Sequence, residues 1–393
     1  MEYWRLEQEI PEQDLGRVVE NLRALRAQLD GDLPAKDAES ELLLATWNIR
    51  DFGKPENLRF GMGKRFPESH FYIAEVLSRF DFVAVQEVNE LEEWTKVMRI
   101  VGPDWDWIAT DVTDRQIGGN GERLTYAWDR RKVDFQNVAG ELVLPTRLLI
   151  SKHIAPKHDK NKDGVKDNPD PSDPTEIDGK PIGQQFRRTP FAALFQSGWF
   201  KFEICTVHVY YGDDSGHRLQ ERIEEIERIG EFFGRRAEED LDEGRSLILL
   251  GDFNIVSHEH ETMQALTNAG FSVPDALSEA PPTNAAGTNY YDQIVFQTKK
   301  GELDYLKAAK DGTNNARAGA VDLFENVYAP DQRAAYEQQR LTAPSSQSKG
   351  ALKDPEGHFL SWRTWQFSDH FPLWVRLKVN NSAKYLEHLN AQG

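Results

Sequence analysis

The 393-residue sequence has one cysteine and a shortage of positive charge. Because Cys205 stands alone, an intramolecular disulfide framework is excluded, and its apolar neighbours in FEICTVHV predict a buried side chain. Lys and Arg number 47 against 65 Asp and Glu, a formal net charge of −18. Since phosphate affinity is largely driven by cations, this charge argues against a surface built for unspecific nucleic-acid binding and leaves open only a local basic groove.

The sequence also lacks internal repeats and long apolar runs. No run reaches the roughly 18 residues of a membrane-spanning helix, and the start, MEYWRLEQEI, lacks the basic and apolar parts of a secretory signal. We therefore expect a cytoplasmic protein, or a secreted one if a signal peptide has been removed. A hydrophobic content of 39% with 28% charged residues is typical of globular proteins, and the length suffices for one large α/β domain or two ordinary ones.

The apolar pattern predicts one main domain with additions at both ends. After Pro11, leucine and valine recur at three- and four-residue spacing, which predicts an amphipathic helix that ends near Gly31 and packs on the main domain. We divide the chain into an N-terminal helix and linker (1–41), a main domain (42–380) and a C-terminal tail (381–393).

Two insertions are predicted within the main domain, at 156–183 and at 300–360. The second is polar, with weak helices such as RAGAVDLF, and is expected at the surface. The first contains the calcium-loop spacing D-x-N-x-D-G, in which alternating oxygens converge on one ion. Its candidate ligands are Asp159, Asn161, Asp163, Asp167 and Asp170. Two interpretations stay open here: a plain insertion without an ion, or a structural Ca²⁺ site.

Short buried strands next to polar side chains are the main functional signal. The stretch SLILLGDFN, residues 246–254, has four apolar residues and a glycine before Asp252 and Asn254. If strand geometry continues past Gly251, both side chains point the same way; the alternative for an isolated D-x-N is an Asx turn. Other predicted strands end or begin at Asn48, Glu87, His208, Asp292, Asp369 and His370.

Together these strand ends would gather carboxylates, amides and two imidazoles in one place. Carboxylate and amide oxygens, with cysteine scarce, favour Mg²⁺ or Mn²⁺ over structural zinc. Imidazoles can transfer protons or contact an oxyanion. The chemistry that fits is metal-assisted hydrolysis of a phosphate ester, in which a metal neutralises developing charge and a base activates water.

The order of the motifs WNIR, QEV, ERLTYAWDRRKV, RTP, TVHVYYG, GDFN, YDQI and SDHFPLW resembles the endonuclease/exonuclease/phosphatase superfamily. Within it, the sequence is most similar to the pancreatic deoxyribonuclease-like nucleases. The resemblance covers about 42–378. It implies an α/β (α+β) fold of the deoxyribonuclease I-like type: a four-layered α/β/β/α sandwich, with two mixed β-sheets face to face and helices outside.

The resemblance also implies roles for the candidate residues. Glu87 and Asn48 resemble the primary divalent-metal site, with Asp369 nearby. Asp252 and Asn254 resemble the pair that aligns the attacking water or a second metal and holds the phosphate.

His208 and His370 resemble the two histidines at the scissile phosphate, which act as acid or base and as hydrogen-bond donors. Asp292 would orient His370, and Glu122 would orient His208. Arg188, in RTP, resembles the phosphate-contacting arginine of the deoxyribonucleases. The pairing of His208 with Glu122 favours that branch over the abasic-site repair enzymes.

We therefore predict a divalent-metal-dependent phosphodiesterase, an endonuclease that hydrolyses DNA by in-line attack of activated water. One alternative, favoured by the acidic charge, is a phosphatase or phospholipase-C-like phosphodiesterase acting on a small phosphorylated or lipid substrate. A non-catalytic binding module is the other. Asn120 stands where the deoxyribonucleases carry a residue that stacks in the minor groove, a departure that concerns DNA engagement rather than hydrolysis.

Overall fold

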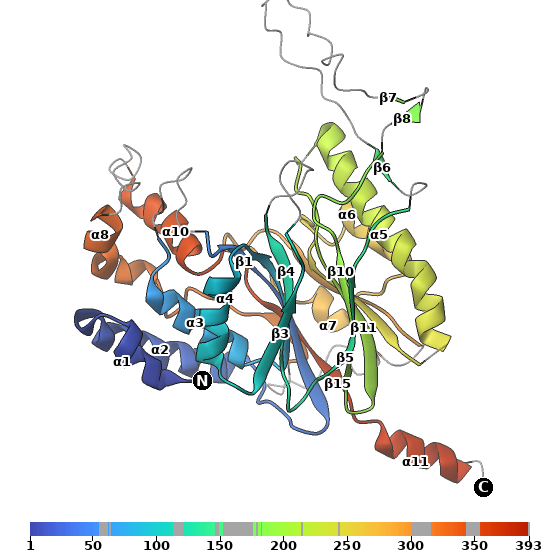
Figure 1. Ribbon diagram of the computed structural model, residues 1–393, viewed down its shortest axis with the longest axis horizontal. Helices are drawn as coiled ribbons and strands as arrows, with labels where there is room; N and C mark the ends of the chain where they lie inside the picture. Colours follow the sequence, from blue (N-terminus) through green and yellow to red (C-terminus); the bar gives the residue numbers. More distant parts are fainter. Residues whose placement is uncertain are drawn as a thin grey trace, which may run out of the picture.

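The computed structural model shows two β-sheets packed face to face with helices on both outer sides (Figure 1). The residues that it describes are 1–54, 62, 64–112, 121–145, 149–151, 176–177, 180–181, 183–213, 215–242, 244–299, 303, 316–342 and 354–391. Within these residues, the sheets have six and five strands. This is the predicted four-layered sandwich, which is confirmed.

The six-stranded sheet has the order β14-β15-β1-β2-β4-β3. Its strands are β1 (Glu41–Phe52), β2 (Phe82–Val88), β3 (Trp105–Ala109), β4 (Arg123–Asp129), β14 (Ala318–Ala320) and β15 (Leu373–Lys378). Only β1 and β2 pair in parallel; the other neighbours are antiparallel, so the sheet is mixed.

The five-stranded sheet has the order β13-β12-β11-β10-β5. Its strands are β5 (Asp134–Glu141), β10 (Phe191–Ser197), β11 (Phe200–His208), β12 (Ser246–Asp252) and β13 (Asp292–Gln297). Here β11 and β12 are the parallel pair. Two short ladders lie outside the sheets: β6 (Ile150–Ser151) with β9 (Gly183–Gln184), and β7 (Glu176–Ile177) with β8 (Lys180–Pro181).

Helices cover the outer face of each sheet (Figure 1). Those associated with the six-stranded sheet are α1 (Leu6–Glu9), α2 (Glu12–Asp32), α3 (Pro67–Ser78), α4 (Leu91–Val101), α8 (Arg333–Thr342) and α10 (Pro355–Gln366). Those on the five-stranded sheet are α5 (Gly216–Asp242) and α6 (Glu261–Asn268). The remaining elements are α7 (Asp275–Ser278), α11 (Ser382–Ala391) and the 3₁₀ turns η1 (Tyr3–Arg5) and η5 (Pro330–Gln332).

Three apolar clusters hold the layers together, because the central strands are buried on both faces. In β1, Leu43 and Ala45 face the helices while Leu42 and Leu44 face the second sheet, as the two-residue period of a strand requires. The third cluster joins β11 and β12 to α5 and α6, and it contains the buried Cys205. A rigid double sheet therefore carries the strand ends.

The N-terminal helix packs on the main domain. Val18, Leu22, Leu25 and Leu29 of α2 are fully or almost fully buried in the same cluster as α3 and β1. No helix in the described segments has both the length and the apolar character needed to cross a bilayer.

The expectation that 300–360 is a surface elaboration with weak helices is wrong for its described parts. The segment AGA of RAGAVDLF forms the edge strand β14 against β15, since backbone pairing there outweighs the weak helical pattern. Val321, Leu323 and Phe324 are buried in the core beneath the helices. Helix α10 begins at Pro355, and the Asp354 side chain caps it by accepting the N–H of Gly357.

Candidate active site

The strand ends with polar side chains meet at one edge of the sandwich. His208, Asp252 and Asp292 lie opposite one another in register across β11, β12 and β13. This follows from the topology, because the carboxyl ends of the parallel strands β11 and β12 lie beside the amino end of the antiparallel strand β13. The same rule places the ends of β1 and β2 beside the starts of β4 and β15.

Asn48 connects the two sheets at this edge. Its Nδ2 donates hydrogen bonds of 3.0 Å to Glu87 Oε1, at the end of β2, and of 3.0 Å to Asp252 Oδ2, at the end of β12. Its Oδ1 accepts the backbone N–H of Arg50 at 2.9 Å. The bond to Glu87 lies within the six-stranded sheet, and the bond to Asp252 crosses to the five-stranded sheet.

His208 lies between two carboxylates and is almost fully buried. Its Nδ1 is 2.6 Å from Glu122 Oε1, and its Nε2 is 3.5 Å from Asp252 Oδ2. Burial and the charge of Arg188 lower the pKa of His208, but the two carboxylates outweigh them, and the pKa is raised above its ordinary value. The structure thus places Glu122 where it can fix the tautomer of His208, so that Nε2 faces the site.

His370 has the same kind of environment on the other side of Asp252. Its Nδ1 is 2.8 Å from Asp292 Oδ2, and its Nε2 is 3.7 Å from Asp252 Oδ2. Burial lowers the pKa of His370, whereas Asp292 and Asp252 raise it, and the carboxylates prevail: the pKa lies well above its usual range. Ser368 holds the segment by accepting the N–H of His370 and donating to Asn48 O.

The strand does not continue to Asn254, in contrast to the expectation from the sequence. It ends at Asp252, and Asn254 has a φ of +53°, in the left-handed region. Asp252 Oδ1 accepts the N–H of Asn254 at 2.9 Å, which is an Asx turn, and Asn254 Nδ2 donates to Val209 O. The Asx turn and the site role of Asp252 coexist, because the turn uses one carboxylate oxygen and leaves Oδ2 facing the histidines.

Acidic side chains gather around Glu87. Burial raises the pKa of Glu87, and the charges of Glu122, Asp51 and Asp369 raise it further, while His208 opposes them. Among the described residues, one group of possible ligands has donor atoms that all lie within 4.8 Å of one another: Glu87, Glu122 and His208. Ionised carboxylates this close together repel one another, and carboxylate oxygens are hard donors. Both properties suit the binding of a divalent cation.

The group of Glu87, Glu122 and His208 shares only Glu87 with the expected ligands, which were Glu87, Asn48 and Asp369. Asn48 presents Nδ2 to Glu87, while Asp369 is half-exposed, with Oδ2 3.5 Å from Arg50 Nε. Its charge nonetheless acts on Glu87. The structure thus brings Asn48, Glu87 and Asp369 to one region, and their roles as ligands stay a prediction.

Arg188 is paired within the protein. Its Nε is 2.5 Å from Glu122 Oε1, and its guanidinium is largely buried. Burial lowers the pKa of Arg188, but Glu122, Glu87, Glu225 and Asp252 raise it above its ordinary value. The Arg188 guanidinium therefore pairs with Glu122, which also contacts His208. The contact of Arg188 with phosphate stays a prediction.

A left-handed turn after Asn48 is a feature that sequence reasoning missed. Arg50 and Asp51 have φ values of +45° and +47°, and the N–H of Asp51 donates to Glu87 Oε2 at 2.6 Å. Arg65 holds this turn: its Nη2 donates to Ile49 O and Arg50 O at 3.3 and 2.9 Å. The arginines and lysines after Asn48 mark this stretch as a basic loop in the sequence. Their charge does not predict a hydrogen bond from a backbone N–H to Glu87.

Arg65 also joins the turn to the end of α10. Its Nε donates to Trp365 O at 3.0 Å, and its guanidinium lies over the rings of Phe52 and Trp365. Gln366 reinforces the connection by accepting the N–H of Phe66 and donating to Lys64 O. Because α10 leads directly to Asp369 and His370, these contacts relate the two parts of the site to each other.

Two predictions fall outside the described residues. The calcium loop, with its ligands Asp159, Asn161, Asp163, Asp167 and Asp170, is one of them. Asn120 is the other. Both stay predictions.

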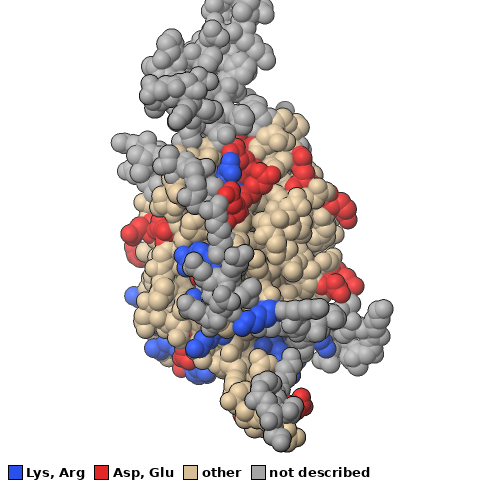
Figure 2. All heavy atoms as spheres, turned by 90° about the vertical axis from the view of Figure 1, so that its right-hand side faces the viewer, with Lys and Arg blue, Asp and Glu red and all other residues tan. Residues whose placement is uncertain are grey.

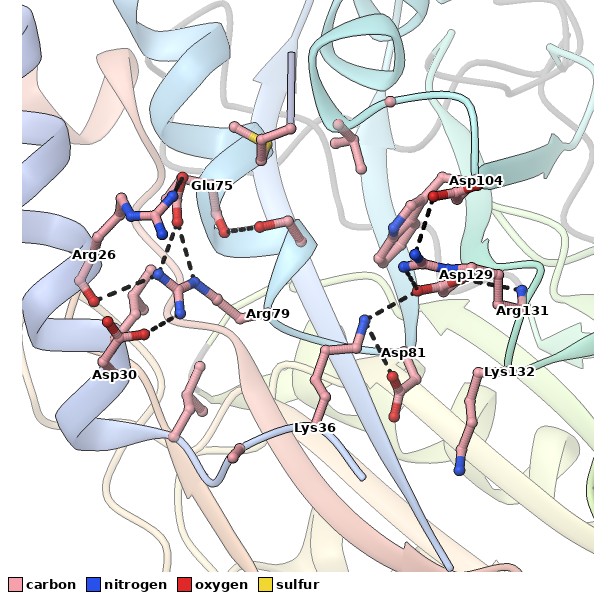
Figure 3. A pocket seen from close by; sticks show the side chains of 18 of the residues that line it. Arg26, Asp30, Lys36, Glu75, Arg79, Asp81, Asp104, Asp129, Arg131 and Lys132 are labelled. Atoms are coloured by element: carbon pink, nitrogen blue, oxygen red, sulfur yellow. Dashed lines mark hydrogen bonds and ion pairs between the residues drawn. The ribbon is translucent and has the colours of Figure 1, made fainter. Parts of the chain in front are cut away.

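A cavity of about 1010 Å³, drawn in Figure 3, lies near the start of β1, where Asp81 Oδ2 accepts the N–H of Leu43. Charged side chains from α2, α3 and the strand ends line it, but they pair with one another. Lys36 is 3.1 Å from Asp81 and 3.3 Å from Asp129, and Arg79 contacts Glu75 at 2.9 Å. This cavity is a charge-paired junction between the N-terminal segment and the sandwich, and it is distant in the topology from the histidines.

The facing mixed sheets, with helices outside and polar side chains at one edge, form a four-layered α/β/β/α sandwich. No family model matches the sequence. A curated relative, a deoxyribonuclease of Thioalkalivibrio sp. (strain K90mix), is 28% identical over 263 residues, which are 65% of this chain and 58% of that protein. The chain thus spans a little over half the length of that relative.

Solved structures with a similar arrangement include two from Bacteroides thetaiotaomicron. One is an endonuclease/exonuclease/phosphatase family protein, 16% identical, with a TM-score of 0.46 over 86% of this chain and 98% of that one. The other is a mannosyl-6-phosphatase, 15% identical, with a TM-score of 0.45 over 85% and 98%. One of these structures bears the name of the superfamily that the motifs resemble.

Proposed function

We propose that this protein is a divalent-metal-dependent phosphodiesterase that cleaves DNA internally by in-line attack of water. One observation carries the proposal: two imidazoles, each backed by a carboxylate at Nδ1, direct their Nε2 atoms toward the same oxygen of Asp252, at 3.5 and 3.7 Å. Two cationic donors converging on one buried acid suit a tetrahedral anion that gains charge during reaction.

The chain's own residues have distinct roles in this scheme. Asp252 Oδ2 accepts the proton of the attacking water, since its other oxygen is already used by the N–H of Asn254. His370, held as an imidazolium by Asp292, donates from Nε2 to a non-bridging phosphate oxygen. His208, backed by Glu122, donates from Nε2 to the phosphate or to the leaving oxygen. Arg188 is paired with Glu122, the partner of His208.

A Mg²⁺ or Mn²⁺ ion would be held by Glu87, with Asn48 and Asp369 nearby. When bound, such an ion neutralises charge that develops on the phosphate oxygens. Its binding would also relieve the repulsion among the acids that raises the pKa of Glu87. The N–H of Asp51 and the Nδ2 of Asn48 orient the Glu87 carboxylate for this role.

DNA as substrate is supported by the curated relative, which is named a deoxyribonuclease. The competing substrate, a small phosphorylated molecule, is supported by the acidic charge of the chain. Figure 2 shows the side covered by α5, where Asp and Glu gather near the upper end and Lys and Arg lie mainly along the lower part of the described surface. Nucleic acid would therefore approach the polar edge of the sheets rather than this side.

The deciding experiment incubates supercoiled plasmid with the protein in Mg²⁺, in Mn²⁺ and in chelator. We expect nicking that requires metal and that falls by at least about a hundredfold in His208→Ala, Asp252→Ala and His370→Ala. The matched control is His260→Ala, a histidine at the start of α6 outside the site, which should retain activity.

Metal-independent nicking, or full activity in all three variants, would contradict the proposed mechanism. Turnover of a phosphorylated sugar or lipid headgroup, without plasmid nicking, would keep the site and replace the substrate. Isothermal titration with Mn²⁺ gives an independent readout, because Glu87→Gln should weaken binding of the ion even in the absence of substrate.

A further inference from the structure

An open pocket of about 400 Å³ borders the His370 imidazole and the Asp369 carboxylate. Two segments form it. One is the loop before β13, residues 284–291, and the other is α10, which contributes Leu360 and Ser361. Because α10 is joined to the turn after Asn48 through Arg65, the pocket is held in place relative to the histidines.

The walls of the pocket combine small apolar side chains and one tyrosine ring with polar groups, which include Asn284 and Thr364. Ala285 and Ala286 line one side, and Leu360 is exposed toward solvent. The ring of Tyr291 packs near His370, with 5.7 Å between the ring centroids. Arg363 also lines the pocket, and its Nε makes no hydrogen bond within the described residues.

This composition suits a flat organic group that is attached to a phosphate, because Tyr291 and small apolar side chains lie beside His370. Among the described lining residues, Arg363 and the His370 imidazolium are cations and Asp369 is an acid, so the positive charge lies at the end of the pocket where the phosphate would be. A volume of about 400 Å³ is within the range of small-molecule sites, roughly 300 to 1,000 Å³. An aromatic ring and small apolar side chains offer a nucleobase a surface for stacking, which tolerates any base because every base has a π-face.

We propose that this pocket binds the nucleobase adjacent to the scissile phosphate. The inference rests on the proposed nuclease function and deepens it. His370 contacts the phosphate in that mechanism, and the pocket begins at His370, so the group that enters it is the next one along the strand. The side chains of α10 then determine how firmly the substrate is held beside the cleaved bond.

The test uses an oligonucleotide in which one phosphodiester is cleavable and the others are phosphorothioates. Its base is removed on one side of the cleavable bond or on the other. For the wild type, we expect kcat/KM to fall about tenfold, mainly through KM, when the base on one side is missing. Ser361→Trp fills the pocket, so this variant should cleave the intact and the abasic substrates equally.

The matched control is Glu356→Trp, which places the same ring on an exposed position of α10 outside the pocket lining and should behave as wild type. Thermal melting shows whether both variants are folded. Cleavage by the wild type that ignores base removal on both sides would overturn the inference alone, as would undiminished discrimination in folded Ser361→Trp. Absence of any cleavage by the wild type would overturn the proposed function and the inference with it.

Discussion

The two carboxylate oxygens of Asp252 have different roles: one stabilises the backbone turn, and the other faces the candidate active site. Oδ1 closes the Asx turn with Asn254, and Oδ2 faces Asn48 and both imidazoles. Gly251 makes this placement possible, since a Cβ there would lie 2.1 Å from Val207 O. β11 and β12 approach closely only without that side chain, and the approach brings His208 beside Asp252.

At the residue scale, we predict that Asp292→Asn lowers kcat/KM by about a hundredfold while leaving the fold intact. The amide can still accept the Nδ1 hydrogen bond, but it lacks the charge that raises the pKa of His370. The imidazolium would therefore lose its proton at lower pH, and activity would decline at lower pH than in the wild type. The measurement is a pH–rate profile with an NMR titration of His370; Asp275→Asn, an exposed acid on α7, is the control.

Glu225 gives a second prediction, on stability. Burial raises the pKa of Glu225 from 4.5 to about 7, against the opposing charge of Arg188. The folded state therefore binds this proton more tightly than the unfolded state, so the wild type loses stability as pH rises from about 4.5 to 7 and levels off above. In Glu225→Gln this loss is absent.

Urea unfolding at pH 5 and pH 8 measures the effect. The free energy of unfolding of Glu225→Gln, relative to wild type, should rise by up to about 3 kcal/mol between the two pH values. Glu227→Gln, an exposed position on the same helix, should show no such rise. Parallel pH dependence in Glu225→Gln and wild type would show that the carboxyl is ionised throughout.

At the scale of elements, the turn after Asn48 and the end of α10 act together through Arg65. Burial lowers the pKa of Arg65 to about 10, which leaves it charged at neutral pH. We predict that Arg65→Met, which keeps the aliphatic packing but removes the donors to Arg50 O and Trp365 O, weakens Mn²⁺ binding about tenfold. Isothermal titration without substrate is the measurement.

The matched control for Arg65→Met is Lys64→Met, an exposed neighbour with the same change of charge. If both variants weaken Mn²⁺ binding equally, local charge rather than the turn explains the effect. If Arg65→Met unfolds at a lower temperature but binds Mn²⁺ normally, the hydrogen bonds of Arg65 stabilise the fold without orienting Glu87.

At the scale of the whole molecule, α2 belongs to the folding unit of the sandwich. Leu25 is fully buried against the layer that covers β1. We predict that Leu25→Ala lowers the free energy of unfolding by about 2 to 5 kcal/mol and that the protein still unfolds in a single transition. Calorimetry measures both quantities, with the exposed Glu20→Ala as control. Two separate transitions would instead support an independent N-terminal unit.

The charge of the whole molecule bears on substrate access. A net charge of −18 repels polyphosphates, so any steering of DNA has to come from local cations and from the bound metal. In the cavity of Figure 3, Asp81 and Asp129 are already paired with Lys36, so they add little to the field that an anionic substrate meets.

The sequence by itself determined the buried strands and the polar residues at their ends, whereas the sandwich was predicted through the resemblance of the motifs to a known superfamily. Buried strands have a two-residue period, and polar residues that end parallel strands meet at one sheet edge, so Asn48, Glu87, His208 and Asp252 were identifiable from local patterns. Only the tertiary structure decided the left-handed turn, the pairing of Arg188 with Glu122 and the pocket on α10. Each depends on contacts between residues distant in the chain or on backbone angles that no local pattern specifies.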